Sequence, residues 1–132
     1  MDYVGTAEHL AITGVSHIQL NVTDLAASTE WYKTVVGLTQ LQAAPGRYAV
    51  LAPEAGGFRL GLSEVHQTGP NSGFGHLAIA LESMDVLHAW VEHLDAIGAP
   101  HTDIKENPFN PGVFSIDVFD PDGHEIELIY EP

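Results

Sequence analysis

Residues 75–81 read Gly-His-Leu-Ala-Ile-Ala-Leu and repeat the pattern of residues 16–22, which read Ser-His-Ile-Gln-Leu-Asn-Val. In both stretches a histidine opens a segment in which large apolar residues take every second place, as in a β-strand with one buried face. The same 59 positions separate His17 from His76 and Trp31 from Trp90. The chain is therefore a duplicated unit, and its two histidines occupy equivalent positions.

Composition limits the classes of function. The 132 residues, 45% of them apolar, fit one domain with a real core. No run approaches the ~18 apolar residues of a membrane span, and residues 1–5 lack the features of a signal peptide, so we expect a cytoplasmic protein. A net charge of −14 would repel nucleic acid and anionic membranes, so we expect neither of them as a partner. Because cysteine is absent, a metal would need His and carboxylate ligands.

The segment pattern predicts the same βαβββ order twice. In the first unit we expect a strand at 15–22, a helix that starts after Thr23 or Asp24 and stops at Gly37, and strands at 38–42, 47–52 and 58–63. In the second we expect a strand at 75–81, a helix between Ser83 and Gly98, and strands at 102–105, 113–119 and 125–130. This divides the chain into an N-terminal arm (1–11) and a single domain (12–132), with repeat 1 at about 12–64, a linker at 65–73 and repeat 2 at about 74–131.

An uncovered sheet face provides the candidate site. A helix covers one face of each βαβββ sheet, so the two remaining faces can curve into an open, cupped mixed β-sheet of α+β class around a cleft. Strand alternation directs the following side chains to that face: His17, Gln19, Asn21, His76, Ala78, Glu125 and Glu127. Both histidines and one or two glutamates therefore converge.

The repeat also aligns the last strand of each unit. Gly57 and Gly123 lie 66 positions apart, and the same offset places Gly61 opposite Glu127 and Tyr48 opposite Phe114. The duplicated site then has four positions, and three of them carry metal-ligand side chains: His17, His76 and Glu127. We expect Gly61, Tyr48 and Phe114 in the substrate pocket, with ordinary sheet packing as the alternative for the two aromatic residues.

Two imidazoles and one carboxylate form the facial triad that suits non-haem Fe(II), and the set also suits Mn(II), Co(II), Ni(II) or Zn(II). We predict one divalent metal ion, with Fe2+ favoured, because Gly61 leaves room for both a substrate and O₂. Gln19 and Arg59 are further candidates for the pocket, and Arg59 could meet a substrate carboxylate. Glu125 is expected to be solvated or to lie beside the ligands, and His124 to be exposed in a turn.

Three stretches, 15–25 (VSHIQLNVTDL), 75–79 (GHLAI) and 120–128 (DPDGHEIEL), resemble the vicinal oxygen chelate superfamily. This superfamily includes glyoxalase I, bleomycin and fosfomycin resistance proteins, methylmalonyl-CoA epimerase and extradiol dioxygenases. The resemblance implies that His17, His76 and Glu127 bind the metal, and that the protein forms a homodimer. Glyoxalase I and the epimerase add a Glu or Gln where this chain has Gly61, whereas extradiol dioxygenases use three ligands but also a Tyr that residues 114–118 lack.

The resemblance leaves three functions open. The first is a dioxygenase-like enzyme that acts on a small oxygen-chelating organic substrate. The second is glyoxalase, lyase, isomerase or thiol-transferase chemistry with Zn, Ni or Mn. The third is a resistance protein that binds a drug or metabolite without turnover.

Overall fold

The computed structural model describes residues 17–65, 76–108 and 110–132, and the predicted arm and most of the predicted linker lie outside these ranges. The elements follow the predicted order twice. The first unit contains β1 (Ile18–Val22), α1 (Leu25–Trp31), η2 (Tyr32–Val36), β2 (Thr39–Ala44), β3 (Tyr48–Ala52) and β4 (Leu60–Glu64). The second unit contains β5 (Leu77–Ala80), α2 (Met84–Ala96), β6 (Lys105–Glu106), β7 (Phe114–Phe119) and β8 (Glu125–Tyr130).

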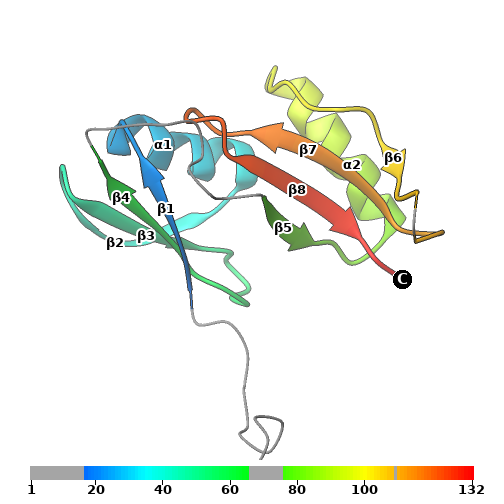
Figure 1. The fold of residues 1–132 in the computed structure, drawn as a ribbon, viewed down its shortest axis with the longest axis horizontal. Helices are drawn as coiled ribbons and strands as arrows, with labels where there is room; N and C mark the ends of the chain where they lie inside the picture. The colour runs from blue at the N-terminus through cyan, green and yellow to red at the C-terminus, as the bar shows by residue number, and fades with distance from the viewer. Residues whose placement is uncertain (1–16, 66–75, 109) are drawn as a thin grey trace, which may run out of the picture.

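The strands form two four-stranded sheets with matching topology. Their orders are β1-β4-β3-β2 and β5-β8-β7-β6, and in each sheet the first strand of the unit runs parallel to the last. Figure 1 shows the two sheets side by side, with α2 behind the second sheet. The predicted α+β class and duplicated βαβββ order are confirmed, and the strands divide into two sheets rather than one continuous sheet.

Strand alternation sets the core as predicted. In β1, Leu20 and Val22 are buried whereas Gln19 and Asn21 are exposed. In β8, Ile126 and Leu128 are buried beneath the helix side, and Glu127 points to the opposite face. The buried apolar residues of both units join into one hydrophobic cluster, so neither unit has a separate core.

Short polar side chains start both helices. Asp24 accepts a hydrogen bond from the backbone N–H of Ala27 at 3.0 Å, and Ser83 accepts one from Val86 at 3.1 Å. The first helix passes into the wider turn of η2 and ends at Gly37, whose φ of 84° is accessible to glycine at little cost. Within the described ranges, no helix is long and apolar enough to cross a membrane.

The turn between β7 and β8 joins the two units. The Asp120 carboxylate is buried, where it accepts a hydrogen bond from the Tyr32 hydroxyl at 2.6 Å and others from the backbone N–H groups of Asp122 and His124 at 3.0 and 2.8 Å. Thr23 donates its hydroxyl proton to Asp122 at 2.6 Å. Figure 1 shows this turn reaching from the second sheet to α1. We call residues 120–124 the inter-unit turn, because their contacts fix one unit against the other.

His124 belongs to the inter-unit turn and corrects the expectation that it is exposed. Its side chain is buried, and Nε2 lies 2.8 Å from the backbone carbonyl oxygen of Asn21. The imidazole can donate a proton there, which satisfies an acceptor at the end of β1. A turn residue is expected to meet water, but this turn packs against the other unit.

We predict that Tyr32→Phe lowers the free energy of unfolding by about 1–3 kcal/mol, because it leaves one oxygen of the buried Asp120 carboxylate without its donor. Burial, followed by the neighbouring Asp120, raises the pKa of the Tyr32 phenol, which keeps the donating proton in place. Urea denaturation measures the change. Tyr48→Phe is the matched control at an exposed hydroxyl and should change stability by less than about 0.5 kcal/mol. Equal losses in both variants would contradict this account.

Candidate functional site

The open face of the second sheet brings His76 and Glu127 together. His76 directly precedes β5, and β5 pairs with β8 so that Ala78 lies beside Glu127. The His76 Nε2 atom is 4.0 Å from Glu127 Oε1. The imidazole is about half-exposed, while the glutamate side chain is only 19% exposed. A water-accessible imidazole and a partly desolvated carboxylate thus face each other.

Glu125 flanks the same histidine on its other side. Its Oε2 atom lies 3.6 Å from His76 Nδ1. At this distance the contact is electrostatic rather than a hydrogen bond, and it adds a second carboxylate beside the imidazole. Of the two expectations for Glu125, the placement beside His76 is the one that this geometry favours.

Burial and several neighbouring charges act on the Glu127 carboxyl. Burial is the largest cause that raises the pKa of its carboxyl, and Asp117 and Glu125 raise it further, while His76 and Lys105 lower it. Asp117 and Glu127 are direct cross-strand neighbours on β7 and β8. Negative charge therefore gathers on this face, and a cation placed between His76 and Glu127 would be stabilised.

The open face of the first sheet carries His17, Gln19 and Gly61. Gln19 lies directly beside Gly61, just as Ala78 lies beside Glu127, so the predicted equivalence of positions 61 and 127 agrees with the strand register. A Cβ added at Gly61 would meet only ordinary contacts, the nearest being 3.7 Å away at the Ile18 carbonyl oxygen. The position can therefore hold a side chain, and glycine leaves this space open.

His17 does not join His76 and Glu127 within one chain. Across residues 17–65, 76–108 and 110–132, no group of three or more His, Cys, Asp or Glu side chains lies close enough to hold a metal ion. Figure 1 shows β1 starting at the lower end of the first sheet, whereas β5 belongs to the second sheet. The structure thus brings together two of the three predicted ligands.

The strand register corrects the predicted match between Tyr48 and Phe114. Gly61 pairs with Val50, eleven positions earlier, whereas Glu127 pairs with Asp117, ten positions earlier. The second hairpin is thus one residue shorter, and a shift of one residue exchanges the faces of a strand. Tyr48 lies on the open face, but Phe114 packs against the core on the helix side.

Arg59 directly precedes β4, two positions before Gly61, so it lies at the start of the first open face rather than on the His76 face. It borders a surface hollow beside the loop between β3 and β4, together with Pro53, Gly57 and Phe58. Its backbone carbonyl accepts a hydrogen bond from Ile18 at 2.9 Å. Arg59 thus belongs to the sheet of Gly61 and not to the sheet of His76, and its place in the substrate pocket remains a prediction.

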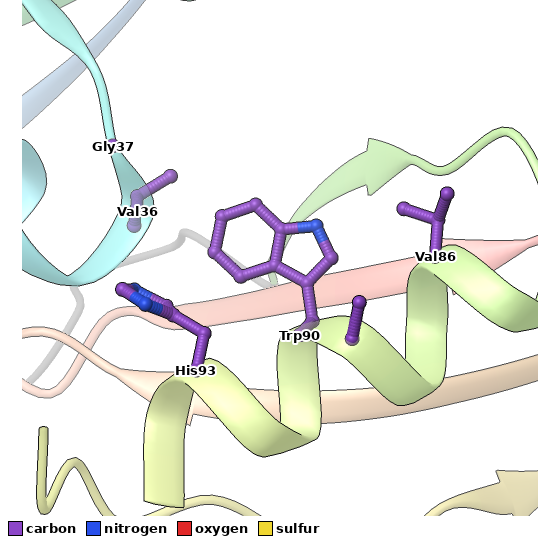
Figure 2. Close-up of a pocket in the computed structure, with 6 residues that line it drawn as sticks. Val36, Gly37, Val86, Trp90 and His93 are labelled. Carbon is purple, nitrogen blue, oxygen red and sulfur yellow. The ribbon is translucent and has the colours of Figure 1, made fainter. Parts of the chain in front are cut away.

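A second hollow lies between the two units and escaped the sequence prediction. It has a volume of about 380 Å³ and lies between the end of η2 and α2. Figure 2 shows Trp90 and His93 of α2 extending toward Val36, with Val86 farther along the helix. His93 Nε2 is 3.1 Å from the carbonyl oxygen of Val35, which commits the imidazole to a structural contact. With no second titratable group in its lining, this hollow offers a binding surface but no evident acid–base pair.

Lys105 and Asp117 complete the second open face, and the sequence prediction did not single out either residue. Lys105 Nζ lies 2.6 Å from Asp117 Oδ2, and Asp117 is the cross-strand neighbour of Glu127. Neither residue belongs to a recognisable motif, and β6 has only two residues. Their proximity follows from the pairing of β6 with β7.

His101 holds the segment that carries Lys105. Its Nδ1 lies 2.7 Å from the Thr102 carbonyl oxygen, and its Nε2 lies 2.7 Å from Asp95 Oδ1 on α2. Thr102 in turn accepts a hydrogen bond from the Asp117 backbone N–H at 2.8 Å. Because both ring nitrogens face oxygen acceptors, the doubly protonated imidazolium satisfies both contacts. The hydrogen bond to Thr102, followed by the one to Asp95, raises the pKa of His101.

Comparison with known proteins agrees with the fold. A model of the Glyoxalase/Bleomycin resistance protein/Dioxygenase superfamily matches residues 14–128. No match was found among curated proteins. A solved glyoxylase/bleomycin resistance protein/dioxygenase domain from Frankia sp. EAN1pec is 27% identical, with a TM-score of 0.77 over 92% of this chain and 100% of that chain.

Two further solved structures have contrasting roles. TnmS3, an antibiotic binding protein from Streptomyces sp. CB03234, is 25% identical, with a TM-score of 0.75 over 94% of this chain and 100% of that chain. The genomically encoded fosfomycin resistance protein FosX from Listeria monocytogenes is 21% identical, with a TM-score of 0.72 over 92% of this chain and 96% of that chain. At this identity the latter likeness concerns the fold alone.

We predict that His101→Gln weakens the protein more at pH 5 than at pH 9. The folded state raises the pKa of His101, so its stabilisation is fully present below the unfolded value of about 6.5 and is lost as pH rises through the folded value. The measurement is the difference in unfolding free energy between wild type and variant at each pH. His88→Gln, on the exposed side of α2, is the control and should give a smaller pH-dependent difference. A wild-type-to-variant difference that does not change with pH would contradict the assignment.

Proposed function

Because the chain belongs to the Glyoxalase/Bleomycin resistance protein/Dioxygenase superfamily, we propose that it is a metal-dependent enzyme for a small oxygen-chelating organic substrate. In this proposal, His76 and Glu127 of one copy and His17 of a second copy hold one divalent metal ion, with Fe2+ favoured over Mn2+, Zn2+, Ni2+ or Co2+. The reaction is dioxygenase-like, and glyoxalase-type or isomerase chemistry is the alternative for the other metals.

The observation that carries the proposal is the pairing of His76 with Glu127. The imidazole Nε2 and a carboxylate oxygen approach within 4.0 Å on one sheet face, with Glu125 as a second carboxylate beside the ring. Their chemistry fits a divalent cation, because a neutral imidazole and a carboxylate are both good ligands for these metals.

The role of Gly61 follows from the space around it. When bound, the metal supplies a Lewis-acid centre that polarises a substrate oxygen. The residues of this chain hold it, orient its ligands and leave room beside it. At Gly61 there is no side chain to act as a fourth ligand, although the backbone would accept one. An open position favours a reaction in which substrate and O₂ bind together.

A second copy of the chain provides the missing ligand. Since His17 lies apart from His76 and Glu127 in one chain, a site with all three requires the first sheet of another molecule. A two-fold arrangement would form two identical sites, each with His17 from one copy and the pair from the other. The exposed side chains of Gln19 and Tyr48 on the first open face are available for such a contact.

The second candidate function is non-catalytic binding of a drug or metabolite. The similarity to TnmS3, an antibiotic binding protein, favours this alternative. Metal content separates the two functions, because a binding protein that acts without metal would keep its ligand affinity after chelation.

We predict that the untagged protein, purified without oxygen, retains about one metal ion per chain, and that His17→Ala, His76→Ala and Glu127→Ala each lower retention at least tenfold through the loss of a ligand. Elemental analysis after dialysis gives the metal content, and O₂ uptake with catechol-like substrates tests for the dioxygenase reaction. His88→Ala is the matched control, an exposed histidine on α2. Equal metal in wild type, His76→Ala and Glu127→Ala would overturn the site assignment.

A mixing experiment tests the site shared by two copies. His17→Ala and Glu127→Ala proteins are each expected to be empty, but a mixed dimer contains one intact site and one doubly disrupted site. Unfolding and refolding the two proteins together in equal amounts should therefore restore metal to about a quarter of the sites, by random pairing. Mixing His76→Ala with Glu127→Ala is the control and restores none, since both residues come from the same copy. Restoration equal in the two mixtures would contradict a site shared between copies.

A further inference from the structure

Asp117 is a buried carboxylate beside the candidate metal ligands. It is 4% exposed, lies on β7 opposite Glu127, and shares the open face because cross-strand neighbours point to the same side. Its Oδ2 atom accepts a hydrogen bond from Lys105 at 2.6 Å. Its Oδ1 atom is buried, and among the described residues it has no hydrogen-bond partner. A buried charge in this state depends on its single cation.

Lys105 is the only Lys or Arg residue of the second unit, in a chain with four basic and eighteen acidic residues. The other three lie in the first unit: Lys33 pairs with Glu30, and Arg47 and Arg59 lie beside loops. The one Lys or Arg residue of the acidic second unit therefore lies on the face that carries His76 and Glu127. The surrounding charges on this face are Asp117, Glu125 and Glu127, whose interactions with Lys105 all favour its protonated form.

The ammonium group of Lys105 has donors to spare. It has three N–H groups, and the hydrogen bond to Asp117 uses one. The Lys105 side chain is 53% exposed, so the remaining donors are open to solvent. The buried Asp117 carboxylate holds the ammonium group in place. An anchored cation with exposed donors has the properties of an anion-binding group.

We propose that Lys105, anchored by Asp117, binds a carboxylate group of the substrate beside the His76–Glu127 pair, so that the substrate is a small organic acid. This inference rests on the proposed function, in which another part of the same substrate binds the metal. Lys105 acts as a specificity-determining residue and Asp117 as a positioning residue. Without Lys105, this face would present only carboxylates to an organic acid.

The chain has only two lysines, which makes a direct test possible. The ¹³Cε signals of Lys33 and Lys105 are assigned with Lys33→Met, and the zinc-loaded and metal-free proteins are each titrated with glycolate. Glycolamide, which lacks the negative charge, is the matched neutral probe. We expect glycolate to shift the Lys105 signal and leave Lys33 unchanged.

Affinity gives a second readout. Lys105→Met should weaken glycolate binding roughly tenfold, as expected for the loss of one charge-assisted contact, and change glycolamide binding less than about twofold. Lys33→Met should bind both probes as wild type does. If Lys105→Met fails to fold because Asp117 is left buried without its cation, the double variant Lys105→Met/Asp117→Asn replaces it.

The outcomes separate this inference from the proposed function. A protein that retains neither iron nor zinc contradicts the metal site, and in that case the metal-free titration decides the role of Lys105. A Lys105 signal that does not respond to glycolate in either form would overturn the inference. Unchanged glycolate affinity in Lys105→Met would do the same.

Discussion

The buried carboxylate of Asp120 is the constraint on which the arrangement of the two units depends. A desolvated charge is tolerated only where donors surround it, and here they come from the Tyr32 hydroxyl and from two backbone N–H groups of its own turn. The set is complete only when the turn between β7 and β8 is docked on η2, which carries Tyr32. Because that contact lies outside both sheets, it fixes the second sheet against the first without closing the two open faces on each other. This explains how two faithfully repeated units can leave equivalent histidines apart.

Much of the fold and part of the site follow from local sequence rules. Alternation in β1 and β8 separates helix-facing from open-face residues because side chains of a strand point to opposite sides in turn. This rule placed His76 and Glu127 on one face, and the parallel pairing of β5 with β8 brings them together. The predicted caps at Asp24 and Ser83 also hold, since each satisfies a backbone N–H within its own helix. These predictions needed no knowledge of distant contacts.

The remaining features depend on information that a local pattern lacks. The equivalence of Tyr48 with Phe114 was wrong because the second hairpin is one residue shorter, a difference visible only in the pairing of β7 with β8. The burial of His124 depends on the docking of its turn against β1. Parity assigns a residue to a face but says nothing about the distance between two sheets, so His17 could be placed on its face but not relative to His76. The contact between Lys105 and Asp117 rests on a two-residue strand without a sequence signature.

The two open faces have diverged in charge, and this bears on how copies of the chain can meet. The paired positions of β1, β3 and β4 on the first face carry no charge, namely Gln19, Asn21, Tyr48, Val50, Gly61 and Ser63. The second presents Lys105 and three carboxylates, those of Asp117, Glu125 and Glu127. Two charged faces in contact would repel each other, and the carboxylates of both would lose their hydration. A neutral face in contact with a charged one meets no such repulsion. Divergence after duplication thus favours the pairing of unlike faces from two copies, and that pairing carries a histidine of the neutral face to the charged one.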